Sequence, residues 1–161
     1  MEALFDEPTA EFLETGCALL VATATGDGAP VATRGWGCRV LERGAGRARL
    51  RVLLARDDPH GYEHAAVGDR VAVTATSVRT LRSVQLKGRI VGIEPATGDD
   101  EDVGAAYREG FFRDINDTDG TPFALLERSA PTGHLAWLVE VDELFDQTPG
   151  PEAGRSLQGR T

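Results

Sequence analysis

Residues 17–41 have the sequence CALLVATATGDGAPVATRGWGCRVL. An apolar run of strand length, residues 17–24, is followed by a second extended segment at residues 30–41. Between them, the glycines of the sequence Thr25-Gly26-Asp27-Gly28 permit the positive φ angles of a tight turn. Two extended segments around a glycine-rich turn predict an antiparallel β-hairpin.

Residues 47–55 show the clearest alternation of polar and apolar side chains. Arginines alternate there with apolar residues: Arg47, Arg49 and Arg51 stand among Ala48, Leu50 and Val52. This period of two predicts a strand with one solvent-exposed face, which carries the arginines, and one buried face. Further strands are predicted at residues 70–77, 83–94 and 134–145.

Helices are predicted at residues 9–15, 58–66, 99–117 and 121–128. In the first of them Thr9 is the predicted N-cap. The longest has apolar residues at helical spacing and acidic residues at 99–102, where the helix dipole favours negative charge.

Tight turns join the first three strands without a helical crossover, so the strands are expected to pair antiparallel. A sheet of six antiparallel strands avoids exposed edges by closing on itself. The predicted fold class is therefore mainly β with flanking helices: a six- to seven-stranded antiparallel β-barrel.

The chain of 161 residues fits one domain, which we place at residues 1–149, followed by a tail at 150–161 that contains glycine and proline. Its longest uncharged apolar stretch is far shorter than the ~20 residues that span a bilayer. The acidic N-terminus lacks the basic region of a signal peptide. We therefore expect a cytoplasmic protein that contacts no membrane, with Cys17 and Cys38 as buried free thiols.

The net charge of −9 is unevenly distributed along the chain. Residues 31–90 hold 12 of the 17 Lys and Arg residues but only 5 of the 26 Asp and Glu residues. A basic segment within an acidic chain argues against binding to long nucleic acids, which need a continuous positive surface, and favours a small anionic ligand. The alternative is that the positive segment is simply a solvated face.

Two motifs suggest chemistry that the rest of the sequence does not support. Residues 60–64 match the zinc-protease pattern H-x-x-E-H, but Pro59 and Gly61 shorten any helix there and a third ligand would have to come from far away. Cys17 and Cys38 with His134 suggest thiol catalysis, yet nothing positions a base beside either thiol. We predict no metal site and assign no catalytic residue.

Two segments combine groups that suit a flat, anionic ligand. In Thr33-Arg34-Gly35-Trp36, the glycine permits close approach of a ligand, Arg34 offers guanidinium donors and Trp36 offers a flat surface. The alternative is a bend of the barrel with a core tryptophan. The second segment places Ser83, Gln85 and Lys87 on one face of a strand, facing either a ligand or water. On neighbouring strands, the two segments would cradle a phosphate-bearing aromatic cofactor.

At these residues the sequence resembles the pyridoxamine 5′-phosphate oxidase-like family, the FMN-binding split β-barrel. The resemblance covers residues 12–149. It rests on the order and spacing of the segments already described and of three others: residues 52–54, 82–88 and 143–150.

The resemblance implies a homodimer with flavin sites at its interface. The strands that carry Thr33 to Trp36 and Leu53 and Leu54 would approach the flavin, while Arg34, Ser83, Gln85 and Lys87 would contact its phosphate or ring. One departure concerns the segment after the third strand, where many members hold the phosphate with basic residues. Here Arg56 is followed by Asp57 and Asp58, so Arg56 must outweigh two carboxylates.

We therefore expect an oxidoreductase that depends on FMN or on the deazaflavin F420 and acts on a small-molecule substrate. In such a protein the cofactor supplies the hydride chemistry. Pyridoxamine phosphate oxidation itself is not expected, because the residues that would hold that substrate are not found. The alternative is a non-catalytic dimer that binds flavin or haem for storage or sensing, with His60, His64 or His134 as a haem ligand.

Overall fold

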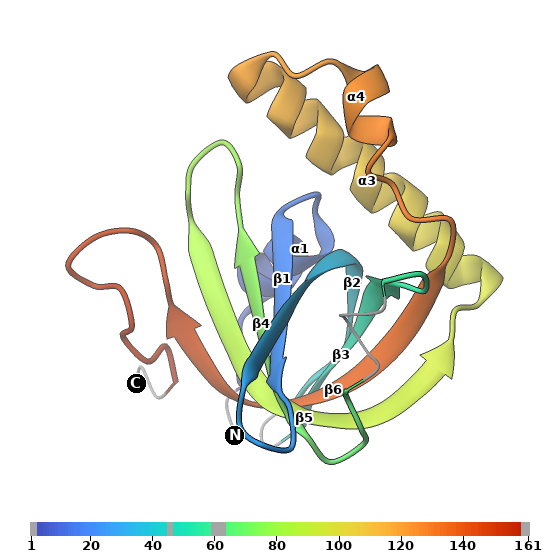
Figure 1. Ribbon diagram of the computed structural model, residues 1–161. Helices are drawn as coiled ribbons and strands as arrows, with labels where there is room; N and C mark the ends of the chain where they lie inside the picture. The colour runs from blue at the N-terminus through green and yellow to red at the C-terminus, as the bar shows by residue number, and fades with distance from the viewer. Residues whose placement is uncertain (1–2, 45–46, 59–63, 159–161) are drawn as a thin grey trace.

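The computed structural model describes residues 3–44, 47–58 and 64–158, and it contains a closed barrel of six antiparallel strands (Figure 1). The strands are β1 (Ala18–Ala24), β2 (Pro30–Gly44), β3 (Arg47–Ala55), β4 (Arg70–Thr76), β5 (Ser83–Pro95) and β6 (His134–Asp146). Around the barrel their order is β1-β2-β3-β6-β5-β4. The predicted mainly-β class and antiparallel pairing are confirmed.

Among the described residues, three helices pack outside the barrel: α1 (Glu7–Glu14), α3 (Gly98–Asp119) and α4 (Phe123–Glu127). Helix α1 begins earlier than predicted, because the Asp6 side chain accepts a hydrogen bond from the backbone N–H of Thr9 and is the N-cap. Of the helix predicted at 58–66, residues 59–63 lie outside the described residues, and residues 64–66 are not helical.

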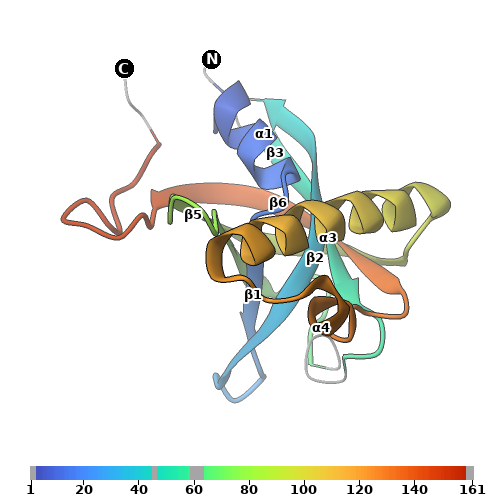
Figure 2. The same cartoon turned by 90° about the horizontal axis from the view of Figure 1, so that it is seen from above.

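Helix α3 crosses the outside of the barrel over β2 (Figure 2). A close backbone contact fixes its distance from the sheet, since a Cβ at Gly16 would lie 2.3 Å from the backbone nitrogen of Phe111. The Tyr107 hydroxyl donates a hydrogen bond to the Cys17 carbonyl at 2.5 Å, and the Phe112 ring meets Trp36 edge-on at 6.4 Å. This helix therefore turns the outer face of β2 into a second buried layer.

The barrel interior is filled by alternate side chains that pair across neighbouring strands. Leu19 lies opposite both Gly35 and Ala75, and Val139 lies opposite both Leu50 and Ile90. Directly opposed residues of an antiparallel pair project to the same face. This alternation determines which residues of each strand face outward, and the candidate site is formed by outward-facing residues.

One prediction about β3 is wrong, because its arginines do not all face solvent. Arg51 is 7% exposed, and its guanidinium binds both carboxylate oxygens of Asp100 at 2.7 and 2.8 Å. Glu94 adds a contact to Arg51 at 2.6 Å, and Arg39 reaches Asp100 at 3.1 Å. The first turn of α3 covers the middle of β3 and brings the carboxylate that allows this burial.

The described part of the tail folds back on β6 instead of extending away from it. The Leu157 N–H donates to the Leu144 carbonyl at 2.9 Å, and Phe145 forms an isolated β-bridge with Ser156. No helix among the described residues has the length and apolar character that crossing a membrane requires.

Candidate functional site

No helix of the described residues covers the outer face of β1, β4 and β5, which carries Ser83, Gln85 and Lys87 of the sequence-predicted site. One row of opposed residues runs across it, with Arg34 opposite Leu20, Leu20 opposite Thr74, and Thr74 opposite Gln85. Leu20 is 56% exposed in the middle of this row. We call the row Arg34–Leu20–Thr74–Gln85 the outer row.

Hydrogen bonds orient the polar side chains on the β5 side of this face. The Gln85 side-chain amide donates a hydrogen bond to the Thr74 hydroxyl at 3.0 Å. The Gln85 carbonyl oxygen accepts a hydrogen bond from Gln147 Nε2 at 3.5 Å. The Ser83 and Thr76 hydroxyls are 2.8 Å apart. These pairs fix the positions of an amide and a hydroxyl beside the exposed Leu20.

A second row below the outer row combines small residues with one cation. Ala22 lies opposite Ala72, which lies opposite Lys87. The Lys87 ammonium sits 4.6 Å from the centre of the Phe145 ring. The small side chains leave this part of the sheet flat enough for another flat surface to approach it.

The structure contradicts the expectation that the Arg34 and Lys87 segments lie on neighbouring strands. Strands β1 and β4 separate β2 from β5 in the barrel. In a closed ring of six strands, β2 and β5 are three positions apart and lie on opposite sides of the barrel, so their outward side chains diverge. Within one chain, Arg34 and Lys87 therefore cannot hold the same phosphate group.

Arg34 lies where the open face meets helix α3. Its guanidinium carbon is 4.3 Å from the centre of the Phe111 ring and 5.0 Å from that of Trp36. The Arg34 Nε is buried with no hydrogen-bond partner among the described residues, and burial lowers the pKa of the guanidinium. A buried cationic donor without an acceptor is a position at which an anionic ligand gains binding energy.

Other predicted residues near Arg34 contribute packing within the single chain. Trp36 is 5% exposed against α3, and a Cβ at Gly35 would lie 2.8 Å from the Leu19 side chain. Leu53 is buried beside Gly37, and Leu54 pairs with Gly35. For Gly35 and Trp36, the bend with a core tryptophan describes the structure.

A third group of predicted residues lies at the rim where β3 ends. The Thr33 hydroxyl donates to the Asp58 carboxylate. Arg56 is exposed and is joined to Gly133, just before β6, by a backbone hydrogen bond of 3.0 Å. The rim therefore presents a guanidinium, with one neighbouring carboxylate already engaged by a hydroxyl.

The histidine and cysteine alternatives gain no support from the geometry. His134 is buried, with Nδ1 2.6 Å from Glu101 and Nε2 against Gly104, so its ring does not face a ligand space. Burial raises the pKa of Cys17 to about 12 and also raises the pKa of Cys38, which disfavours reactive thiolates. His60 and most of the 60–64 motif lie outside the described residues.

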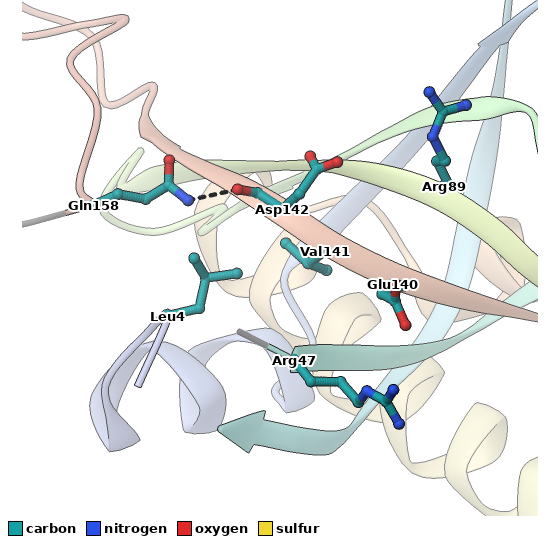
Figure 3. A pocket seen from close by; sticks show the side chains of 7 residues that line it. All are labelled: Leu4, Arg47, Arg89, Glu140, Val141, Asp142 and Gln158. Carbon is teal, nitrogen blue, oxygen red and sulfur yellow. Dashed lines mark hydrogen bonds between the residues drawn. The ribbon is translucent and has the colours of Figure 1, made fainter. Parts of the chain in front are cut away.

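No cluster of three or more metal-ligating side chains occurs within residues 3–44, 47–58 and 64–158. The described chain does contain a pocket of about 320 Å³ on another side of the barrel (Figure 3). It is lined by Leu4, Arg47, Arg89, Glu140, Val141, Asp142 and Gln158. In Figure 3 the two arginine head groups point apart, so the pocket does not direct them toward one shared anion.

Comparison with solved structures identifies the architecture. HupZ from Group A Streptococcus matches with a TM-score of 0.52 and 14% identity, over 93% of this chain and 99% of that chain. A candidate pyridoxamine 5′-phosphate oxidase from Lactobacillus delbrueckii matches with a TM-score of 0.52 and 15% identity, over 88% of this chain and 93% of that chain. The chain has the split-barrel fold.

This split barrel is thus the fold that the sequence resemblance predicted. An F420 reductase is also similar, with 17% identity and a TM-score of 0.49, over 87% of this chain and 98% of that chain. Neither a protein-family model nor a curated protein matches the chain.

The sequence did not predict several residues of the outer row and of the rim where β3 ends. Leu20 and Thr74 belong to the outer row but lie in strands that read as ordinary sheet. Gln147 reaches the face from the segment after β6, and Glu101 reaches the rim from α3. The polar alternation of β4 was the available signal for Thr74, whereas the other contacts depend on how distant segments pack.

Proposed function

We propose that two copies of this split barrel associate through the open face of β1 and β4 and bind FMN, or F420, between them. In this proposal the dimer is an oxidoreductase that acts on a small molecule. The observation that carries it is the outer row, in which an exposed leucine lies between an incompletely partnered arginine and an oriented glutamine.

The order of the outer row explains why two copies are needed. A two-fold axis parallel to the strands, passing between β1 and β4, reverses the row in the second copy. Arg34 of one copy then faces Gln85 of the partner subunit, and Leu20 packs toward Thr74 of the partner subunit. Groups on opposite sides of one barrel are thereby placed at the same edge of the contact, twice in each dimer.

The residues present suit a phosphate-bearing isoalloxazine or deazaflavin. Arg34 and Arg56 offer forked donors for a phosphate, and Lys87 adds a positive charge. Gln85 supplies an amide for the polar edge of a ring or for the ribityl chain. Ser83, which is 5% exposed and donates to the Leu81 carbonyl at 3.0 Å, supports the neighbouring Thr76 hydroxyl. When bound, the flavin supplies hydride transfer, while these side chains bind it and orient it.

Equilibrium titration with FMN, F420 and haemin, followed by absorbance, tests the cofactor. Saturable binding of FMN or F420 supports the proposal. A Soret band with haemin and no flavin binding would instead support the non-catalytic haem alternative. Binding of none of the three contradicts the proposed function.

A mixing experiment tests whether the site is shared between copies. Arg34→Ala and Gln85→Ala dimers are each expected to bind FMN at least about tenfold more weakly, as the loss of a charge-assisted or buried hydrogen bond implies. After the two variants exchange subunits, each heterodimer contains one site with both side chains intact, so a fraction of the tight sites returns. If no tight site returns, Arg34 and Gln85 do not meet across an interface.

Leu20→Lys provides the matching test of assembly. The substitution places a charge at the middle of the proposed contact and leaves the barrel interior unchanged, so the mass from light scattering should fall from dimer to monomer. Thr25→Lys, in the exposed β1–β2 turn, is the control and should leave the mass unchanged. A wild-type monomer at all concentrations contradicts the shared site.

Activity separates the enzyme from a storage or sensing protein. The outer row contains no carboxylate or histidine, which suits hydride transfer directly between a cofactor and a substrate. Reduced FMN bound to the enzyme should pass its electrons to a quinone acceptor faster than free reduced FMN does. Slower oxidation than in free solution, together with tight binding, favours storage.

A further inference from the structure

Strand β6 extends beyond β3 along one of its two edges. The pairing of β3 with β6 ends at Ala48 opposite Val141, whereas the pairing of β5 with β6 continues to Val84 opposite Asp146. Among the described strands of the barrel, residues 142–146 therefore have a partner on the β5 side only. We call the other side of residues 142–146 the β6 edge. Such an edge presents N–H and C=O groups that can pair with another extended backbone.

The chain's own C-terminal segment, residues 154–158, occupies the β6 edge, and we call this segment the tail strand. The two run antiparallel, with Phe145 opposite Ser156. Three backbone hydrogen bonds of 2.7–2.9 Å join them, which run, donor first, from Gly154 to Asp146, from Asp146 to Arg155 and from Leu157 to Leu144. The β6 edge therefore already binds an extended backbone.

The side chains of the tail strand show which sequence fits the edge. The Arg155 guanidinium lies 3.8 Å from the Asp146 carboxylate, and Leu157 packs against the hydrophobic core. The Gln158 side chain donates a hydrogen bond to the Asp142 carbonyl at 2.5 Å (Figure 3). An extended segment with an arginine two residues before a leucine thus matches both the charge and the apolar surface at this edge.

The pocket of about 320 Å³ lies where the tail strand and β3 approach each other along β6. Gln158 lines it from the tail strand and Arg47 from the start of β3, while Leu4 and Val141 are its apolar side chains (Figure 3). A bound peptide that continues past the position of Gln158 would bring its next side chain to this pocket. The pocket therefore offers a place for a further specific contact.

The tail strand is held more weakly than the strands of the barrel. Each of its residues is exposed or half-exposed. The preceding loop contains Pro149, Gly150 and Pro151, and Gly154 has a φ of 88°, which glycine adopts without strain. Segments with few buried contacts open locally at a small cost in free energy. The tail strand can therefore leave the edge while the barrel stays folded.

We propose that the β6 edge is a docking site for an extended peptide segment of a partner protein, and that the tail strand occupies this site until the partner displaces it. The partner segment binds antiparallel to β6 and, like the tail strand, carries an arginine two residues before a leucine. In strand addition of this kind, main-chain hydrogen bonds supply affinity and side-chain pockets supply specificity. The proposal does not require that the chain binds a cofactor.

Leu157→Pro tests the proposal in the full chain. Proline lacks the N–H that bonds the Leu144 carbonyl, so the tail strand should leave the edge. The probe is a labelled, end-capped peptide with the sequence of residues 154–158, and fluorescence polarisation measures its binding. The variant should bind it at least about tenfold more tightly than wild type, in which the tail strand competes. Ser156→Ala, which keeps the three backbone bonds, is the matched control and should bind as weakly as wild type.

Amide hydrogen exchange locates the bound peptide. The Asp146 N–H, which donates to the Arg155 carbonyl, should exchange faster in Leu157→Pro than in wild type, and saturating peptide should slow it again. The same peptide with an N-methylated leucine lacks the matching donor and should bind at least about tenfold more weakly. Gly154→Pro removes another of the three bonds and provides a second variant with the same expected behaviour.

Three results would overturn the proposal. Equal binding of the peptide to wild type and to both proline variants would place it away from the edge. Absence of binding to either folded proline variant would show that the edge accepts a strand only as part of its own chain. A mass that rises with protein concentration in the proline variants, without peptide binding, would assign the edge to a second copy.

Discussion

The two outer faces of the barrel differ in what covers them. Over β2 and β3, α3 brings aromatic rings and a carboxylate that bury Trp36 and Arg51. Over β1 and β4 no helix packs within the described chain, and Leu20 remains 56% exposed. The covered face therefore stabilises the fold, while the open face is the one to which we assign association and binding in the proposed function.

The largest effect is expected on the covered face, from Asp100→Asn. This change removes the buried carboxylate charge paired with Arg51 and leaves only the half-exposed Glu94 opposite it, so the free energy of unfolding should fall by about 3–5 kcal/mol. Urea denaturation measures the loss. Asp102→Asn, exposed on the same helix, is the control. An equal loss of unfolding free energy there would mean that the loss does not come from the buried Arg51–Asp100 ion pair.

The pH dependence of the same variant sharpens the comparison. The hydrogen bonds from Arg51 hold the pKa of Asp100 well below its ordinary value. A carboxyl with a depressed folded-state pKa stabilises the fold above its unfolded pKa, about 3.9, and this contribution is lost as the pH falls further. The difference in unfolding free energy between wild type and Asp100→Asn should therefore shrink as the pH is lowered below about 4.

Adjacent leucines of β1 provide the next test, because Leu19 is 1% exposed and Leu20 is 56% exposed. Leu19→Ala should destabilise the chain by about 2–5 kcal/mol, and Leu20→Ala by less than about 0.5 kcal/mol within a single copy. Any further loss for Leu20→Ala must depend on protein concentration, since it would come from association. A large, concentration-independent loss contradicts an open face.

The smallest effect is expected at Leu81, in the turn between β4 and β5. Leu81 is 56% exposed and has a φ of 61°, a left-handed conformation that costs a leucine about 1 kcal/mol. Leu81→Gly should raise the free energy of unfolding by up to about 1 kcal/mol. The larger conformational entropy that glycine gives the unfolded chain reduces this gain. Leu81→Ala keeps the strain and should give no gain; destabilisation by the glycine would show that the leucine side chain has a stabilising contact.

The sequence predicted the strands well because local patterns determine them. The alternation in residues 47–55 and the glycine turn at 25–28 both predict the observed β-structure. The burial of Arg51 could not be predicted in this way, because its partner Asp100 lies 49 residues away on a helix.

The candidate site was only partly predictable for the same reason. Arg34, Ser83 and Gln85 were predicted as ligand contacts from their chemistry, but the order of strands around the barrel separates β2 from β5. Chain order suggested neighbours, whereas closure of the barrel inserted β1 and β4 between them. The positions of Glu101 and Gly133 around Arg56 likewise follow from tertiary packing.

The closed ring of six strands has a consequence for how assembly can change. Each strand already has two backbone partners, so copies of this chain cannot join by extending a shared sheet. In the proposed dimer, contacts between copies would therefore be made by side chains alone. A few surface substitutions could therefore abolish or restore this assembly, or change its binding partner, while each barrel stays folded.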